Sequence, residues 1–472
     1  MEVEALVKKE NPGSKSGFTR WDAFALELSR VNWIALPMIV ATVSQYLLRV
    51  SPMFMLGHLN ELSLSSASIA TSLCNVTGFS VLFGMASALE TLCGQAYGAE
   101  QYKKVGTYSI GAIFCLFVVC IPLSLLFMLT EKLLVLMGQD PLIAAEAGKF
   151  AILLIPTLFP YAILQCLVRY LQCQSLILPM VWSSLVSLGF QLFLCWAFIF
   201  KFELGNAGAA LSIGVAYWFN VILLLLYVKY SPACDRTHAS FSMETLREFF
   251  QLAIPSSAMV CLEWWSFELI LLLSGVLPNP QLETSVFSIC FTISYLHGLI
   301  PYSFGAAAST LISNELGAGK PEAAQVTLYT VLALSIAEFL VASFGLVICS
   351  PILGYAFSEE KEVVDYVKKM APFLSVLLTM DGLQEVFSGV ARGSGWQYIG
   401  AYVNLGAYYL VGVPVALLMA FVADLKGAGL WCGLIVGATV QSIALSFITG
   451  FTNWEKQAMV ARQRIYSGQI PN

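Results

Sequence analysis

Long apolar runs recur along almost the whole chain, and they constrain the fold more than any other feature of the sequence. Twelve runs of about 20 or more residues, each long enough to span a bilayer, lie at 31–56, 65–90, 105–129, 147–169, 177–200, 207–228, 249–276, 285–311, 325–350, 369–390, 398–421 and 428–451. As α-helices they would cross a hydrocarbon core of ~30 Å at ~1.5 Å per residue. Isolated strands would leave backbone groups unpaired in lipid. We therefore predict an all-α membrane protein with twelve transmembrane helices.

Composition agrees with this prediction and argues against several classes of function. Only 11% of the 472 residues are charged, less than half of the ~25% that is usual in soluble domains. The net charge of −5, without a cluster of Lys and Arg, argues against nucleic acid as a partner. Most of the twelve cysteines lie inside apolar runs, so we interpret them as membrane hydrophobes. The segment LGAGKP at 316–321 lacks the first Gly and the Ser or Thr of a phosphate-binding loop, so no nucleotide partner is predicted.

The distribution of basic residues predicts the orientation in the membrane. If the N-terminus is cytosolic, the cytosolic segments carry 16 Lys and Arg, among them Arg169 and Arg392, and the opposite segments carry 7. Arg49 remains inside the first span. This asymmetry and the even number of spans favour both termini in the cytosol. The first 30 residues hold ten charges and no apolar stretch, so they are interpreted as a cytosolic tail rather than a signal peptide.

The chain also repeats itself at an offset of about 220 residues, and many transporter folds are built from internal repeats. Leu36-Pro37 matches Ile254-Pro255 at an offset of 218, and Tyr97-Gly98-Ala99 matches Leu316-Gly317-Ala318 at an offset of 219. Because each unit has six spans, the two units cross the membrane in the same sense, related by a pseudo-two-fold axis along its normal. We predict a tail at 1–30, a first lobe at 31–229, a polar linker at 230–248, a second lobe at 249–451 and a cytosolic tail at 452–472. Such an architecture favours secondary transport over catalysis.

Four motifs resemble one transporter family over nearly the whole chain. They are GMASALETLCGQAYGA at 84–99, LEWW at 262–265, PYSFGAAASTLISNELGAG at 301–319 and DGLQEVFSGVARGSGWQYIGAYVNLGAYY at 381–409. The sequence resembles the multidrug and toxic compound extrusion transporters, in the eukaryotic branch and most like the plant members. The resemblance implies a V-shaped pair of six-helix lobes that exports organic solutes in exchange for protons. The chain departs from the family pattern at Asn60, Leu311 and Glu385.

Acidic residues well inside the spans are the main candidates for coupling, because an ionised carboxylate costs about 2.5–3.5 kcal/mol at the centre of a span. They are Glu263, Glu268, Glu338, Asp381 and Glu385. Helical rise places Glu263 roughly 20 Å above the cytosolic edge and Asp381 about 16 Å above it, so both lie near the midplane. If they share a cavity, mutual repulsion would keep a proton on at least one of them near neutral pH. We therefore predict that Glu263 and Asp381 couple transport to protons.

The resemblance supports the same pair. The helix-seven glutamate tied to coupling in the family falls on Glu263, the glutamate five residues on falls on Glu268, and the helix-ten acid falls on Asp381. The first span has no acid, so coupling should rest on the second lobe.

Further residues are candidates for the proton or substrate pocket, each with a structural alternative. Glu268 lies about 140° around the helix from Glu263, so it should face a different neighbour. Gln384 and Glu385 lie beside Asp381, and Glu385 shares its helix face. Trp264 could line an aromatic pocket for flat cations or simply pack. His297 could relay protons or be a hydrogen-bonding strut, and Glu338 is expected to pair locally.

Three prolines are candidate bending points of the helices: Pro37, Pro255 and Pro301. Static kinks are the alternative.

Two rival functions remain open at this stage. A sodium-coupled carrier would need several fixed oxygen ligands, and a lipid-flipping carrier would need a basic groove, whereas the spans contain almost no Lys or Arg. A membrane-embedded enzyme would need a catalytic or metal-binding set, and the chain has only three His. We expect no cofactor or metal, protons as the coupling ion, small organic substrates, and residence in the plasma or vacuolar membrane.

Overall fold

The computed structural model describes residues 20–238, 241–357 and 360–466. The predicted tails at 1–30 and 452–472 and the predicted linker at 230–248 lie partly outside these residues. Every regular element of the described residues is helical. In chain order they are α2 (Arg20–Leu56), α3 (Glu61–Cys74), η1 (Asn75–Phe79), α4 (Ser80–Ala86), α5 (Ala88–Gly98), α6 (Tyr102–Met128), α7 (Thr130–Leu136), α8 (Pro141–Cys173), α9 (Leu178–Trp196), η2 (Ala197–Lys201), α10 (Gly205–Tyr230), η3 (Pro232–Thr237), α11 (Met243–Ser274), α12 (Pro280–Gly317), α13 (Pro321–Leu353), η4 (Gly354–Ala356), α14 (Lys361–Ser394), α15 (Gln397–Asn404), η5 (Leu405–Gly412), α16 (Val413–Leu417), η6 (Leu418–Val422), α17 (Lys426–Gly450) and α18 (Trp454–Tyr466).

Twelve helical stretches of the described chain are long and apolar enough to cross a membrane, which confirms the predicted fold class. Four of them are compound: α3 continues through η1, α4 and α5, α9 through η2, α13 through η4, and α15 through η5, α16 and η6. Five-residue to eight-residue π-helical segments interrupt three of these stretches without ending them. Such segments often lie at functional sites, because they re-aim the side chains that follow.

The helices extend beyond the apolar runs at most of their ends. The second span was expected at 65–90 and continues to Gly98, while the tenth was expected at 369–390 and runs from Lys361 to Ser394. The additional turns carry polar and charged residues that reach past the hydrocarbon core or pair inside the protein. Hydropathy alone therefore ends most of the spans too early.

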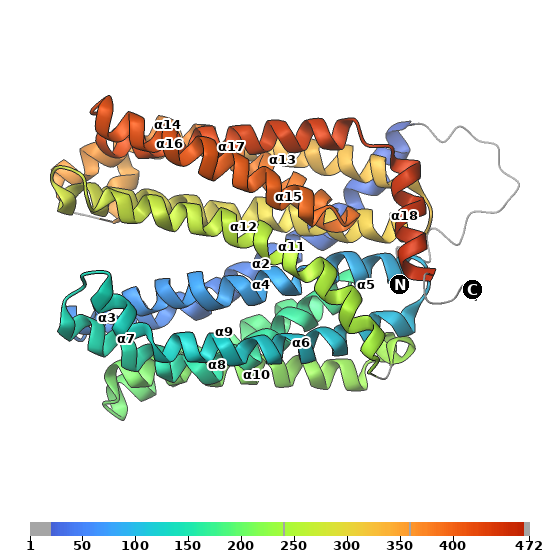
Figure 1. Cartoon of the computed structure of the whole chain (residues 1–472), viewed down its shortest axis with the longest axis horizontal. Coiled ribbons are helices and arrows are strands. Elements are labelled where there is room, and N and C mark those ends of the chain that lie inside the picture. Colours follow the sequence, from blue (N-terminus) through green and yellow to red (C-terminus); the bar gives the residue numbers. More distant parts are fainter. Residues whose placement is uncertain (1–19, 239–240, 358–359, 467–472) are drawn as a thin grey trace, which may run out of the picture.

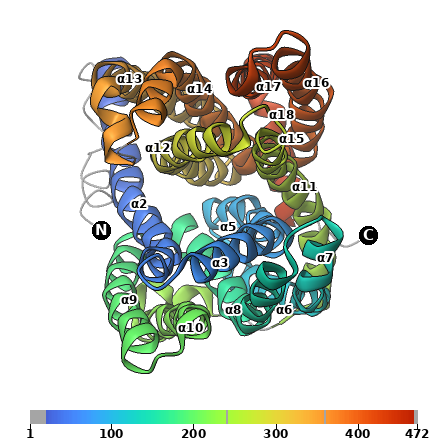
Figure 2. The same cartoon turned by 90° about the vertical axis from the view of Figure 1, so that its left-hand side faces the viewer.

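Figures 1 and 2 show two helical bundles side by side, one from the blue to green part of the chain and one from the yellow to red part. We call α2 to α10 the first bundle and α11 to α17 the second bundle. Helices α2 and α11 run along their boundary and bond to both. In α2, Gln45 donates to Ser184 of α9 at 3.5 Å, and Thr42 lies 3.4 Å from Ser303 of α12. In α11, Ser257 donates to the carbonyl oxygen of Val81 in α4 at 3.4 Å.

The departure from the family pattern at Asn60 has a local explanation. Asn60 precedes α3 with φ −164°, and its side-chain oxygen accepts a 2.7 Å hydrogen bond from the backbone N–H of Ser63. It therefore caps the first turn of α3, where unpaired N–H groups need acceptors. Leu311, the second departure, is buried in the apolar core.

The C-terminal helix α18 lies across the end of the molecule where the two termini of the described chain lie, here called the terminal end (Figure 1). Arg464 donates to Gln95 of α5 at 2.7 Å, and Lys104 of α6 donates to the carbonyl oxygen of Ile465. On the other side, the ring of Trp454 packs 6.1 Å from the ring of Trp396, which precedes α15. Helix α18 thus joins both bundles at this end.

Candidate functional site

A cavity of about 400 Å³ lies between the two bundles. This volume is within the range of small-molecule sites, about 300–1,000 Å³. Its walls come from α2, α3, η1, α4, α8 and α10 of the first bundle and from α11, α12 and α14 of the second. Most of the lining is apolar or aromatic, with a small number of charged groups. The arrangement suits an organic molecule with at least one polar group.

The second bundle contributes an acidic wall to this cavity. Glu263 of α11 and Asp381, Gln384 and Glu385 of α14 all line it. The structure therefore brings together the two acids predicted to couple transport, although they are 118 positions apart in the sequence. The amide of Gln384 donates to Glu263 Oε2 at 2.9 Å and to Ser388 Oγ at 3.0 Å. Gln384 thus links the α14 wall directly to the α11 carboxylate.

A chain of buried amides holds Glu263 from behind, and sequence reasoning missed it. Gln441 of α17 donates to Asn404 Oδ1 at 2.7 Å, and Asn404 donates to the carbonyl oxygen of Met259 at 2.7 Å and to Glu263 Oε2 at 3.4 Å. Both amide side chains are fully buried. The signal in the sequence was the presence of neutral amide side chains inside apolar runs, but the candidates were chosen mainly among charged residues. A change in the charge of Glu263 will therefore alter the strength of the hydrogen bonds along this chain.

Glu268 and Trp264 line the same cavity but face the first bundle. Ser72 of α3 donates to Glu268 Oε2 at 3.0 Å, so Glu268 has a different neighbour from Glu263, as its position around the helix predicts. The ring of Trp264 stacks on Phe83 of α4 with a centroid distance of 5.4 Å. Both contacts cross between bundles on the cavity side of α11.

His297 is not among the residues that line the cavity. Its Nε2 atom lies 3.0 Å from Glu338 Oε1 of the adjacent α13, and both side chains are largely buried. The expectation that Glu338 pairs locally is therefore wrong, because its partner is 41 positions away on another helix. Two polar side chains that pair within a membrane-spanning region have a lower free-energy cost than either unpaired side chain would have there.

The three prolines lie inside long helices, Pro37 in α2, Pro255 in α11 and Pro301 in α12. All three of these helices line the cavity. Their role as bending points stays a prediction.

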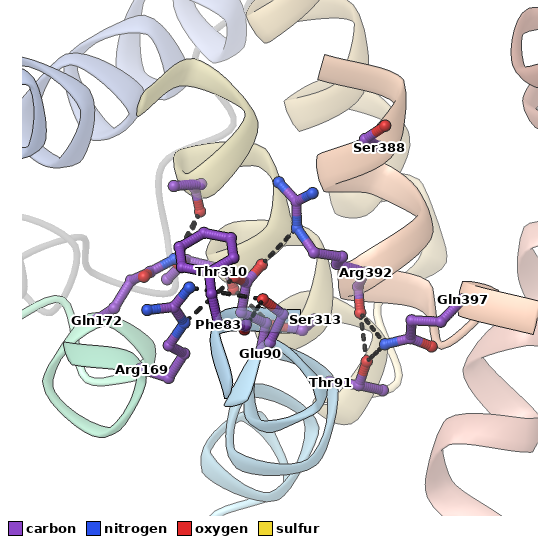
Figure 3. Close-up of polar contacts among 12 residues, drawn as sticks. Phe83, Glu90, Thr91, Arg169, Gln172, Thr310, Ser313, Ser388, Arg392 and Gln397 are labelled. Atoms are coloured by element: carbon purple, nitrogen blue, oxygen red, sulfur yellow. Dashed lines mark hydrogen bonds and ion pairs between the residues drawn. The ribbon is translucent and has the colours of Figure 1, made fainter. Parts of the chain in front are cut away.

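A buried ion cluster joins the bundles on the terminal side of the cavity (Figure 3). Glu90 of α5 lies 3.0 Å from Arg392 of α14 and 3.7 Å from Arg169 of α8. The side chains of all three are at most 6% exposed. Arg169 and Arg392 were counted with the cytosolic segments, outside spans that were expected to contain almost no Lys or Arg. In the structure the helices continue past the apolar runs, and both side chains lie inside these helices, buried in protein.

Further hydrogen bonds, most of them to backbone carbonyl oxygens, extend this junction. Thr91 donates to the carbonyl oxygen of Arg392, and Gln397 donates to Thr91 Oγ1 at 2.6 Å. Gln95 donates to the carbonyl oxygen of Gly393 at 3.2 Å, and Gln172 to that of Ala306 at 3.1 Å. The bundles are thus held together toward the terminal end, while the cavity lies between them farther from it.

Glycines allow α5 and α12 to cross in close contact at this junction. A Cβ atom at Gly98 would overlap the backbone of Asn314, and one at Gly317 would overlap the backbone of Gln95. We expect Gly98→Val to push the bundles apart there, since overpacking of this kind costs about 1–3 kcal/mol. Amide hydrogen exchange should rise in 91–98 and 309–317, and transport should slow.

Gly345→Val in α13 is the matched control, because a Cβ atom there meets no atom within 4 Å. It should leave both exchange and transport unchanged. Unaltered exchange at the crossing in Gly98→Val would show that the contact between α5 and α12 does not hold the junction.

Comparison with known proteins gives one consistent result. The MatE family model matches residues 37–197 and 255–418. DETOXIFICATION 14 of Arabidopsis thaliana is 52% identical over 460 residues, covering 97% of this chain and 94% of that protein, and DETOXIFICATION 12 of the same plant is 52% identical over 447 residues, covering 94% and 93%. A crystal structure of a eukaryotic MATE transporter, AtDTX14, superposes with a TM-score of 0.91 at 53% identity, covering 94% of this chain and all of that one.

Proposed function

Because the chain belongs to the MatE family of multidrug and toxic compound extrusion transporters, we propose that it exports organic solutes in exchange for protons, through the cavity between its bundles. A multi-pass efflux transporter is what the family assignment establishes, and membership of a transporter family argues against the enzyme alternative. The coupling ion, the substrate class and the residues that carry them are the proposal.

The observation that carries this proposal is the acidic wall of the cavity. Glu263, Asp381 and Glu385 come from two helices and line one cavity. Carboxylates that share a poorly solvated site repel one another when ionised, and a bound proton relieves that repulsion. The same space is large enough for an organic solute. Proton and solute can therefore compete for one site, which is the minimum that exchange requires.

Protonation would act through the hydrogen bonds of Glu263. Its Oε2 atom accepts from Gln384 of α14 and from Asn404 of α15. A neutral carboxyl group accepts more weakly than a carboxylate, so these charge-assisted bonds weaken when the proton binds. We infer that α11 then shifts relative to α14 and α15, with Pro255 as the point where it bends. The reshaped acidic wall releases the solute.

Alternating access requires that the cavity open to each side in turn. In this structure the junction of Glu90, Arg169 and Arg392 joins the bundles at the terminal end. With both termini cytosolic, as the basic residues predict, the cavity lies toward the external or vacuolar side. We propose that the two lobes, predicted at 31–229 and 249–451, rock about the linker between them and break this junction when the cavity faces the cytosol.

The coupling ion can be tested with the purified protein in liposomes, using uptake of ethidium, a flat organic cation followed by fluorescence. Uptake driven by an imposed pH gradient should collapse to the level of empty liposomes on addition of a protonophore. Replacement of sodium by choline should leave it unchanged. Uptake that depends on sodium at a fixed pH gradient would contradict proton coupling and favour the sodium-coupled rival.

A further inference from the structure

Arg49 of α2 lies in the wall of the cavity and has surroundings unlike those of the acids. Its guanidinium group donates one hydrogen bond, from Nη2 to the phenol oxygen of Tyr295 at 3.3 Å. The phenols of Tyr161 and Tyr217 are near enough to interact with it electrostatically, and so is that of Tyr46. All four tyrosines also line the cavity. One side of the cavity is therefore cationic and rich in phenol O–H groups.

No carboxylate of the described residues lies within 4.0 Å of this guanidinium. Three other arginines in the spans each have such a partner. Arg30 lies 2.8 Å from Glu27, Arg392 lies 3.0 Å from Glu90, and Arg169 lies 3.7 Å from Glu90. Arginine keeps its positive charge in proteins, and a cation inside a membrane protein is costly unless water or an anion compensates it. Arg49, which is partly buried, is thus the exception among the arginines that are partly or fully buried in the described spans.

The chemistry of this group of side chains suits an anion. A guanidinium presents several N–H donors in a planar fork that matches a carboxylate or sulfonate. Phenol groups can accept from the guanidinium and donate their own O–H to the same anion. The rings of Tyr46 and Tyr295 pack 5.0 Å apart beside it, which provides an aromatic flank. The carboxylates of the acidic wall, on α11 and α14, lie more than 4.0 Å from the Arg49 guanidinium, so they form no ion pair with it.

We propose that Arg49, with Tyr46, Tyr161, Tyr217 and Tyr295, forms a subsite for the anionic group of an organic solute. This inference rests on the proposed function, because it assigns a substrate class to the same cavity. Solutes that carry a carboxylate or sulfonate on an aromatic or cationic framework would bind with the anion at Arg49 and the framework toward the acidic wall. Purely cationic solutes would use the acidic wall alone.

The test compares two fluorescent probes that differ in one group. Rhodamine B carries a free carboxylate, and its ethyl ester has the same cationic ring system without that anion. Binding to the purified protein is measured by fluorescence anisotropy at neutral pH without any gradient. Arg49→Gln should weaken binding of rhodamine B by about tenfold or more, the scale of a lost charge-assisted hydrogen bond. Binding of the ester should change by less than about twofold.

Three further variants sharpen this comparison. Arg49→Lys should retain part of the preference, since it keeps the charge but not the fork. Tyr295→Phe should weaken rhodamine B binding less than Arg49→Gln does. Lys201→Gln, which removes an exposed positive charge outside the cavity lining, should affect neither probe.

Equal weakening of both probes in Arg49→Gln, or no change in either, would overturn the subsite. So would a wild-type protein that binds the ester but not rhodamine B. Because binding is measured without a gradient, loss of proton coupling in the transport assay would overturn the proposed exchange mechanism and leave this result standing.

Discussion

Glu263→Gln and Asp381→Asn are each expected to abolish transport driven by a pH gradient while leaving the protein in the membrane. Both substitutions keep the shape and hydrogen-bonding capacity of the side chain but remove its ability to exchange a proton. If one conformation of the transporter binds the proton about 100-fold more tightly than the other, proton binding shifts the equilibrium between them by about 2.7 kcal/mol. Either variant loses this contribution. We therefore expect a fall of about 100-fold in gradient-driven ethidium uptake, a size that follows from the same relation.

Exposed acids of α14 provide matched controls for this experiment. Glu362→Gln and Asp365→Asn make the same chemical changes on the same helix, but both side chains are exposed near its first turn. They should transport ethidium at the wild-type rate. Full activity in Glu263→Gln or in Asp381→Asn would remove that residue from the coupling mechanism.

The second large effect is expected at the buried junction, where the outcome depends on which charge is removed. Glu90→Gln leaves Arg169 and Arg392 without the carboxylate that they share, and breaking a buried pair in this way costs about 3–5 kcal/mol. Arg392→Gln leaves Glu90 with Arg169, and both of these belong to the first bundle. We expect Glu90→Gln to lower the thermal stability strongly. Arg392→Gln should lower it less but weaken the link between bundles.

A double-mutant cycle tests whether Glu90 and Arg392 stabilise the protein through their contact or independently of one another. Thermal unfolding of the detergent-purified protein is measured for both single variants and for Glu90→Gln/Arg392→Gln. Because the double variant leaves one unpaired arginine instead of two, it should be more stable than the sum of the single losses predicts. Strictly additive losses would show that the 3.0 Å contact between Glu90 and Arg392 contributes nothing to the junction.

The fold was accessible from the sequence because its main determinant is local. Each span is specified by an apolar run, and the weak repeat at about 220 residues predicts that the spans form two sets of six. Glu263 and Asp381 could be placed at a common depth by counting residues, and the structure puts both in one cavity. Most of the predicted ends of the spans were wrong, because the polar turns that continue these helices pair inside the protein and carry no hydropathy signal.

The rest of the site depends on contacts between distant segments, which composition and periodicity do not report. Glu90 meets Arg392 across 302 positions, and Gln441 reaches Asn404 across 37. The pairing of His297 with Glu338 is of the same kind. Arg49 was visible only as a basic residue inside the first span. The subsite proposed around Arg49 depends on tyrosines contributed by four different helices.

The central claim is that organic solutes are exchanged for protons. The most direct test measures ethidium entry and proton exit in the same liposomes. Liposomes containing the protein and a trapped pH-sensitive dye are placed in sodium-free buffer without a pH gradient, and ethidium is added outside. If ethidium enters in exchange for protons, the lumen should become alkaline as ethidium accumulates, and neither change should occur in empty liposomes or with Glu263→Gln. Protein-dependent entry of ethidium at constant lumenal pH would contradict proton exchange.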